Sequence, residues 1–498
     1  MQQSNPSNPL PPISPEVAAA WRIRSTPSTS GTHTAYREDS LLITGTPAQR
    51  EELLGRVSKE AATFRAETSE RYLGPEKDVH SDSNRRVTIR VELHAQPGEV
   101  DALAIKERID DPAVALDHMM FCAADISGAP YYAGVPYYAG VPYYAGVPYY
   151  AGVPYYAGVG SPAATYGQPG SGGRVPVSLL LADPAKGRKQ PKRPPVVVIP
   201  DTGLGPHPWF QDPDRATDEV YVQGELLGRH GSLPNSQVPE PWRNPLDGSV
   251  LPFAGHGTFA AGIVRQTCPE ARILAIPIMT DDGVVAESCL LETLGWLAVR
   301  QEEAIEGSKS EELIDVISLS LGYYHEEPED ALSDAPLRLA LERLFEAGVM
   351  VVTAAGNNAT TAPMFPAAFA DPEGSPAAQA QATVGALNPD GSTAWFSNHG
   401  PWITCHRRGA AVVSTIPVDL QGHAQPAAAL DAEGHRRTTI DPDCFASGFA
   451  TWSGTSFAAP AFAGEFAAGI AQSPIRKLDR ANVTARITQV RDEIAKLR

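Results

Sequence analysis

The chain has 498 residues, 42% of them hydrophobic, which is enough for a large domain with its own core and a smaller unit beside it. Its formal net charge of −18 argues against nucleic acid as a partner, because surfaces that bind nucleic acid are basic. Residues 1–38 contain no apolar run long enough for a signal peptide or a membrane span. We therefore expect no membrane partner and a cytoplasmic location, with secretion as the alternative.

Residues 1–38 are rich in Pro, Ser, Thr and Asn, which predicts a disordered N-terminal tail. The cysteines of the chain are five in number, at wide spacings: Cys122, Cys268, Cys289, Cys405 and Cys444. An odd, widely spaced set indicates neither a disulfide framework nor a structural metal site, which agrees with a reducing compartment.

Residues 39–128 have the pattern of a small α+β domain. Thr46 and Gln49 form a capping box with Pro47 at the first helical position, which predicts a helix to about Thr63. Further elements are predicted on either side of it: strands at 41–43, 87–93 and 113–122 and a second helix from Glu99. The order is strand, helix, strand, helix, strand.

Residues 129–194 are predicted to be a low-complexity linker. The unit Pro-Tyr-Tyr-Ala-Gly-Val occurs five times between Pro130 and Val159. A proline in every unit removes amide donors and blocks a regular helix, so the repeats favour a linker over a solenoid. A flexible segment of this length would reach about 30 Å, enough for the first domain to lie against the second.

From residue 195 to residue 498, short apolar runs alternate with helical patterns. This alternation predicts an α/β domain with a doubly wound, mostly parallel sheet and helices on both faces. In such sheets the functional residues gather at the carboxyl ends of the strands. Asp201 and Asn357 each follow an apolar run, Val196–Ile199 and Val351–Ala354 respectively, which places both at that edge.

Three short strings carry side chains typical of acyl transfer. Asp201 ends a strand, His256 lies between two glycines at a helix start, and Ser456 follows Gly454 and Thr455 at the start of an Ala-rich helix. A serine hydroxyl needs a base to take its proton and donors to hold the resulting oxyanion. Taken singly, each residue also suits a scaffold role: a turn acid, a helix cap and the first residue of a core helix.

In the order Asp, His, Ser these strings resemble those of the subtilisin-like serine peptidases, the subtilases. The resemblance implies that Ser456 is the nucleophile, that His256 is the general base and acid, and that Asp201 orients the imidazole. It also implies an oxyanion hole formed by the Asn357 amide and the Ser456 backbone N–H, with Asn358 as a one-residue alternative. Two segments would form the walls of the substrate groove: Ser320, Leu321 and Gly322, and Ala354, Ala355 and Gly356.

The element order of residues 39–128 resembles the propeptide domain that many subtilases carry, which implies an intramolecular inhibitor; an unrelated α+β adaptor is the alternative. The family often binds calcium, but the sequence contains no acidic cluster specific enough to predict a site, so no cofactor is assigned. The expected function is an endopeptidase acting on polypeptides. Two alternatives remain open: an inactive or self-inhibited binding or scaffold protein, and a peptidase that processes itself once.

Overall fold

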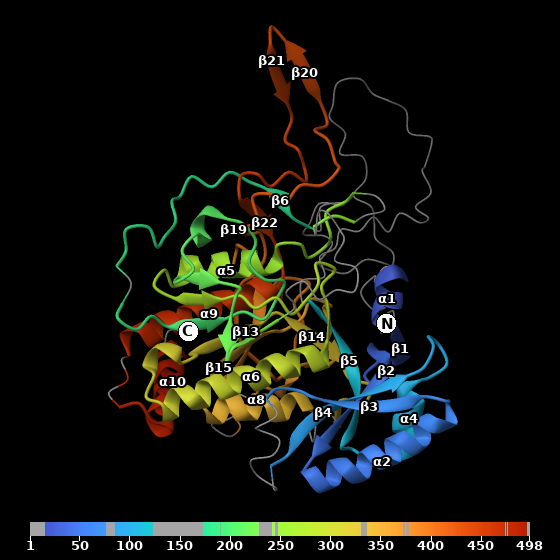
Figure 1. The fold of residues 1–498 in the computed structure, drawn as a ribbon. Coiled ribbons are helices and arrows are strands. Elements are labelled where there is room, and N and C mark those ends of the chain that lie inside the picture. Colours follow the sequence, from blue (N-terminus) through green and yellow to red (C-terminus); the bar gives the residue numbers. More distant parts are fainter. Residues whose placement is uncertain are drawn as a thin grey trace, which may run out of the picture.

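The computed structural model describes residues 15–75, 85–122, 173–189, 191–228, 242–244, 248–329, 336–371, 374, 378–473, 475 and 477–495. The Pro-Tyr-Tyr-Ala-Gly-Val repeats lie outside the described residues. Two bodies are visible in Figure 1, a large one built on a parallel sheet and a smaller one formed by the N-terminal residues.

The larger body contains a sheet of seven strands in the order β18-β17-β15-β13-β7-β11-β8, and every neighbouring pair in it is parallel. Its central strands are continuous apolar runs because both faces of the sheet are covered. The strands are β7 (Val196–Val198), β8 (Ala216–Thr217), β11 (Arg272–Leu274), β13 (Val316–Leu319), β15 (Met350–Ala354), β17 (Gln381–Leu387) and β18 (Ile403–Arg408).

Helices cover both faces of this sheet (Figure 1). On one face α9 packs on β13, β15 and β17 with α5 beside it, and on the other face α8 packs on β15 with α6 beside it. The helices are α5 (His256–Thr267), α6 (Glu287–Glu306), α8 (Pro336–Glu346), α9 (Thr455–Gln472) and α10 (Arg480–Ala495). A Cβ at Gly464 of α9 would collide with Thr267 of α5, so a small residue lets these two helices pack closely. The predicted parallel α/β architecture is therefore observed.

Short strands and 3-10 turns complete the larger body. The strands are β6 (Val175–Pro176), β9 (Tyr221–Val222), β10 (Glu225–Leu226), β12 (Val284–Ala286), β14 (Leu321–Tyr324), β16 (Met364–Phe365), β19 (Val412–Thr415), β20 (Ala429–Ala432), β21 (His435–Thr438) and β22 (Phe449–Trp452). The turns are Pro208–Phe210, Ser310–Glu312, Ala367–Phe369 and Ala378–Ala380. The β20–β21 hairpin projects from the top of the molecule in Figure 1.

The N-terminal body is a four-stranded antiparallel sheet, in the order β3-β4-β2-β5, that packs against α2 and α4. A further strand, β1, pairs with β2. The elements are α1 (Pro15–Trp21), β1 (Ile23–Pro27), β2 (His33–Gly45), α2 (Pro47–Thr63), β3 (Glu67–Tyr72), β4 (Val87–His94), α4 (Ala102–Ile109) and β5 (Val114–Cys122). The predicted capping box at Thr46 is present, and Val57, Ile89 and Ile105 lie in a separate apolar core.

The prediction of a disordered tail over residues 1–38 is wrong for residues 15–38, which form α1, β1 and the beginning of β2. Strand β1 runs antiparallel to β2 from Ile23 to Pro27, and Trp21 is buried against Met119 and Val284. A segment rich in Ser and Thr becomes ordered here because it joins a sheet whose other strands come from later in the chain.

The two bodies share a sheet. Strand β5 of the N-terminal body pairs antiparallel with β14 on one side, at Cys122–Leu321 and Phe121–Gly322. It also pairs antiparallel with β12, from Met119–Ala286 to Phe121–Val284. The last residues of β5 are therefore inserted between two strands of the larger body.

In the described part of the chain, no helix is both long enough and apolar enough to cross a membrane.

Candidate active site

Asp201 lies at the carboxyl edge of the parallel sheet, three residues after the end of β7. Its backbone N–H donates to the carbonyl of Ile276 at 2.9 Å, and it forms a parallel bridge with Pro277. Its Oδ1 accepts a hydrogen bond from the Thr202 backbone N–H at 2.7 Å. The carboxylate is fully buried and is therefore held in one orientation.

His256 is the first residue of α5, directly after Gly255, whose φ of 79° reverses the chain before the helix. Its Nδ1 lies 2.8 Å from Oδ1 and 2.9 Å from Oδ2 of Asp201, and both side chains are fully buried. Burial by itself lowers the pKa of His256, but the charge of Asp201 and the sulfur of Cys122 outweigh burial and raise this pKa to about 10. The raised pKa favours the charged imidazole while Cys122 is docked beside it.

Ser456 is the second residue of α9 and its side chain is fully buried; within the described residues its hydroxyl contacts Ser320 and Cys122 and makes no hydrogen bond with His256. The rings of His256 and Phe457 lie 5.3 Å apart between centroids, so the helix start and the imidazole are neighbours. The hydroxyl of Ser456 donates to the Ser320 carbonyl at 3.5 Å, and the Ser456 carbonyl accepts from the Ser320 hydroxyl at 3.0 Å. The positive end of the helix dipole lies at this serine.

Asn357 follows β15 and faces the first turn of α9. Its Oδ1 accepts hydrogen bonds from the backbone N–H and the hydroxyl of Thr455, both at 2.9 Å. These two bonds fix the orientation of the amide, so its Nδ2 points the other way. Nδ2 is buried and has no hydrogen-bond partner among the described residues. A buried donor left in this state is costly unless a ligand supplies the acceptor.

The residues predicted to form the groove walls lie around Ser456. Ser320 exchanges two hydrogen bonds with Ser456, and Leu321 and Gly322 pair with β5. On the other side, the Gly356 N–H donates to the Thr455 hydroxyl at 3.0 Å, and Ala354 and Ala355 are fully buried.

Cys122, the last residue of β5, lies close to both His256 and Ser456. Its Sγ is 3.2 Å from Nε2 of His256 and 4.0 Å from Oγ of Ser456. Its backbone N–H donates to the carbonyl of Gly283 at 2.9 Å. The end of the N-terminal domain thus lies between β12 and β14, next to His256 and Ser456.

A second contact fixes β5 farther from the catalytic side chains. Oδ1 of Asp117 accepts the backbone N–H of Ser288 at 2.9 Å, and Oδ2 accepts the Ser288 hydroxyl at 2.8 Å. Ser288 is in the first turn of α6, so a residue of one domain caps a helix of the other. Asp117 and Ser288 are both buried.

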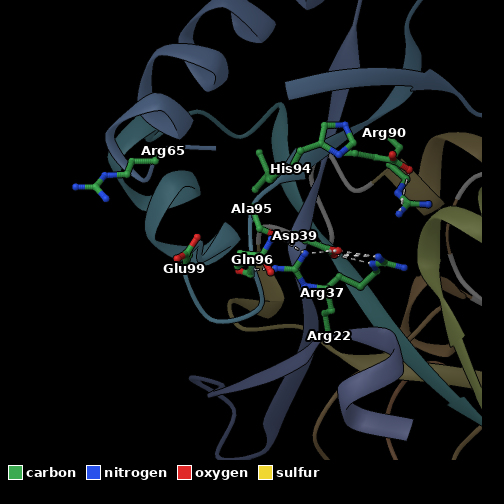
Figure 2. Close-up of a pocket in the computed structure, with 11 residues that line it drawn as sticks. Arg22, Arg37, Asp39, Arg65, Arg90, His94, Ala95, Gln96 and Glu99 are labelled. Atoms are coloured by element: carbon green, nitrogen blue, oxygen red, sulfur yellow. Dashed lines mark hydrogen bonds and ion pairs between the residues drawn. The ribbon is translucent and has the colours of Figure 1, made fainter. Parts of the chain in front are cut away.

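A hollow of about 550 Å³ lies elsewhere, in the N-terminal domain, and Figure 2 shows its lining. Four arginines line it, Arg65 among them, and three of the four are paired with carboxylates: Arg22 with Glu38, Arg37 with Asp39, and Arg90 with Glu92. Asp201, His256 and Ser456 are not among its lining residues, so this hollow is separate from the catalytic group.

Within the described residues, His118, His325 and Glu326 form a compact group of metal-ligand types. Calcium prefers oxygen ligands, so this nitrogen-rich group does not suit it. His325 Nδ1 already accepts the Glu327 backbone N–H at 3.0 Å, and both ring nitrogens of His118 face carboxylate oxygens. We therefore assign no metal ion to this group.

The model of the subtilase family matches residues 193–491, which is more than half of the chain. The chain belongs to the subtilase family. The prediction of this family is thus confirmed, and the matched region contains Asp201, His256, Asn357 and Ser456.

Known relatives share the subtilase region with this chain at moderate identity. Subtilisin-like proteinase Mp1 of Magnaporthiopsis poae is 30% identical over 44% of this chain and 48% of its own length. Serine protease AprX of Bacillus subtilis is 26% identical over 56% of this chain and 57% of its own length. Thermitase of Thermoactinomyces vulgaris is 26% identical over 60% of this chain and 81% of its own length. This subtilase therefore spans about half the length of the first two relatives.

A crystal structure of a cold-adapted subtilisin-like serine proteinase aligns with 64% of this chain and 89% of its own chain, with 17% identity and a TM-score of 0.37. A match at this level does not by itself establish a common fold. The parallel sheet with helices on both faces is what the strand pairings of this subtilase show.

Sequence reasoning missed two contributors to the site. Cys122 was placed only at the end of a predicted closing strand, and Thr455 only as a small residue before the nucleophile. The position of Cys122 depends on pairing with residues more than 150 positions later, which leaves no local pattern. Thr455 had a weak signal, since a hydroxyl at a helix start often bonds a neighbouring chain segment.

Proposed function

We propose that this subtilase is a serine endopeptidase whose N-terminal domain blocks its own substrate groove. The observation that carries the proposal is the buried bond between Asp201 and His256 beside Ser456, with one sulfur atom in contact with both the imidazole and the serine hydroxyl. These contacts support a shared site for Asp201, His256 and Ser456, which come from distant segments of the sequence.

In the proposed reaction, Oγ of Ser456 attacks the scissile carbonyl carbon and His256 Nε2 accepts the hydroxyl proton. Asp201 holds the Nδ1–H tautomer and stabilises the imidazolium that forms. The C–N bond then breaks, and the same proton passes from Nε2 to the leaving amine. Water attacks the acyl-enzyme with His256 as the base, which releases the second product and restores Ser456.

Asn357 supports this chemistry as a donor to the oxyanion. Its Oδ1 is held by Thr455 and its Nδ2 has no bond within the described structure, so the amide needs no reorientation to receive a negative oxygen. Such preorganised donors stabilise charge that appears only in the transition state. The Ser456 backbone N–H, in the first turn of α9, is the proposed second donor.

The N-terminal domain is the proposed intramolecular inhibitor. Strand β5 pairs with β12 and β14 in the way that an extended substrate would, and Cys122 engages the nitrogen that the nucleophile needs. Ser320, Leu321 and Gly322 lie along the docked strand, which supports their assignment to one groove wall. Displacement of β5 is therefore the step that would open the site to a polypeptide.

Labelling of the full-length protein with a fluorophosphonate tests the nucleophile and the block together. Four proteins are compared: the parent chain, Ser456→Ala, Cys122→Arg and Cys122→Ser. The introduced guanidinium would place a second cation against the charged His256 imidazole, so Cys122→Arg should label far faster than the parent, with Cys122→Ser as the small, uncharged control. Ser456→Ala should not label. Absence of label in both the parent and Cys122→Arg would favour the scaffold role.

Intact-mass measurement distinguishes a self-processing peptidase from one that acts on other proteins. A single-event peptidase would be cut once and would then hydrolyse no added peptide, whereas Ser456→Ala would stay whole. We expect opened protein to turn over an added peptide repeatedly. One cut per chain without further turnover would contradict this.

A further inference from the structure

His118 lies in β5, four residues before Cys122, and is buried between two carboxylates of the catalytic domain. Its Nδ1 is 2.6 Å from Oε2 of Glu287, the first residue of α6. Its Nε2 is 2.9 Å from Oε2 of Glu326, just beyond β14. The single side chain therefore joins the inserted strand to both elements that flank it, α6 and β14, which lie beside β5 in Figure 1.

Two ionised carboxylates at these distances call for a charged imidazole. Burial raises the pKa of Glu287, and the contact with His118 opposes that rise. A neutral ring has one N–H and can donate to one carboxylate only, whereas the imidazolium donates to both. Burial by itself lowers the pKa of His118, but Glu326 and Glu287 outweigh it and raise this pKa to about 9. Burial likewise raises the pKa of Glu326, yet His118 outweighs it and the net shift is downward.

Other ionisable groups around His118 do not replace this charge. His325 stands 4.9 Å away between ring centroids, and its pKa is lowered to about 3 by burial first and by His118 second, so it stays neutral. Nζ of Lys106, in α4, lies 3.2 Å from Oε1 of Glu326 and pairs with it. The remaining groups that face the cluster are Tyr323, stacked on His118 at 4.4 Å, Tyr36 opposite it on β2, and Asp117 on β5.

We propose that His118 is a proton-dependent clasp that holds the N-terminal domain in the substrate groove and releases it as the pH rises. The inference rests on the self-inhibition proposed above and names how it is regulated. When β5 leaves the groove, His118 loses both carboxylates and its pKa returns to about 6.5. The docked state has the higher pKa, so protonation favours docking.

The direction of the effect follows from this difference. The stabilisation of the docked state by His118 is fully present below about pH 6.5 and is lost as the pH rises through about 9. Each pKa unit corresponds to about a tenfold change in the docking equilibrium, so docking should weaken by about two orders of magnitude across this range. Self-inhibition is therefore strong at neutral pH and weak in alkaline solution.

The test compares fluorophosphonate labelling rates of full-length protein and His118→Gln from about pH 6 to about pH 10. Dividing the two rates cancels the pH dependence of the Ser456 and His256 chemistry, which both proteins share. We expect His118→Gln to label about 10–100-fold faster at the lowest pH and at nearly the parent rate at the highest. A ratio that stays constant with pH, or one near unity throughout, would overturn the clasp. His94→Gln, a change at an exposed histidine of the same domain, is the matched control.

A second measurement does not depend on activity. Hydrogen exchange of residues 114–122 is followed in the Ser456→Ala background, with β15 as the internal reference for intrinsic exchange. Protection of β5 should fall with rising pH in the parent and should be low at every pH in His118→Gln. Equal, pH-independent protection would reject the clasp even if no protein is labelled, whereas missing label with the expected exchange pattern would reject the peptidase activity alone.

Discussion

Sγ of Cys122 lies 3.2 Å from Nε2 of His256, on the nitrogen that faces away from Asp201. This contact joins the last residue of the N-terminal domain to the imidazole of the catalytic group. In a peptidase reaction the same nitrogen would have to take the proton of Ser456. Under the proposed reaction, Cys122 therefore engages the base of this subtilase while β5 is docked.

Removal of the Cys122 sulfur should lower the pKa of His256, because this sulfur is among the groups that raise it to about 10. The change is Cys122→Ala, and the measurement is an NMR titration of the His256 imidazole in the Ser456→Ala background. Cys268→Ala, at a buried cysteine just beyond α5, is the control and should leave the titration unchanged. An identical His256 titration in the parent and Cys122→Ala would contradict the contact.

Replacement of the Asn357 amide should reduce kcat by about 10²–10³ with little change in KM, because the lost donor acts on the transition state. Asn357→Asp is the informative change, since it keeps the Oδ1 acceptor for Thr455 and replaces the Nδ2 donor with a carboxylate oxygen that cannot donate. Peptide hydrolysis is measured in the Cys122→Arg background. Asn358→Asp is the matched control, because the Asn358 side chain accepts from the Tyr324 hydroxyl at 2.9 Å. Equal losses of kcat in the two variants would argue against Asn357, and not Asn358, as the donor to the oxyanion.

Loss of the cap on α6 should loosen the N-terminal domain. Asp117→Ala removes both bonds to Ser288, which is worth about 1 kcal/mol for a helix cap and thus about a fivefold weaker docking equilibrium. The labelling rate of Ser456 should rise by about the same factor. Asp117→Asn keeps the acceptor for the Ser288 N–H and should show a smaller rise; a larger rise in Asp117→Asn than in Asp117→Ala would be inconsistent with a cap.

A methyl group at Gly257 should destabilise the catalytic domain. A Cβ there would collide with the carbonyl oxygen of Gly203, which lies against the start of α5, so Gly257→Ala should cost about 1–3 kcal/mol in the free energy of unfolding. Gly55→Ala is the opposite case, because Gly55 lies in α2 with open space around it and should gain about 0.5–1 kcal/mol. Denaturant unfolding of both variants measures the two changes in free energy. An unfolding free energy of Gly257→Ala equal to that of the parent would show that the Gly203 backbone can move away from α5 without cost.

The positions of Asp201, His256 and Ser456 were predictable because each lies at the end of a strand or the start of a helix. Asp201 follows a Val-rich run, His256 sits between glycines, and Ser456 begins an Ala-rich helix, so neighbouring residues alone mark a strand end or a helix start. The alternation of runs and helices likewise predicted the parallel sheet, whose carboxyl edge brings strand ends together.

The docking of β5 was not predictable from local pattern. Sequence reasoning recognised residues 113–122 as a strand, but a strand pattern does not name its partners, and β12 and β14 lie far along the chain. The same holds for His118, whose two carboxylate partners are separated from it by 169 and 208 residues. The composition of residues 15–38 predicted disorder, but β1 within this range pairs with β2, which follows it in the chain.

The amino-acid sequence by itself thus determined which side chains of this subtilase are suited to acyl transfer and which elements carry them, because helix starts and strand ends are encoded by adjacent residues. Only the tertiary structure decided that Cys122 meets His256 and that a buried histidine links the two domains. Pairing between distant strands depends on the shape and charge of both partners at once, and no single stretch of sequence contains both.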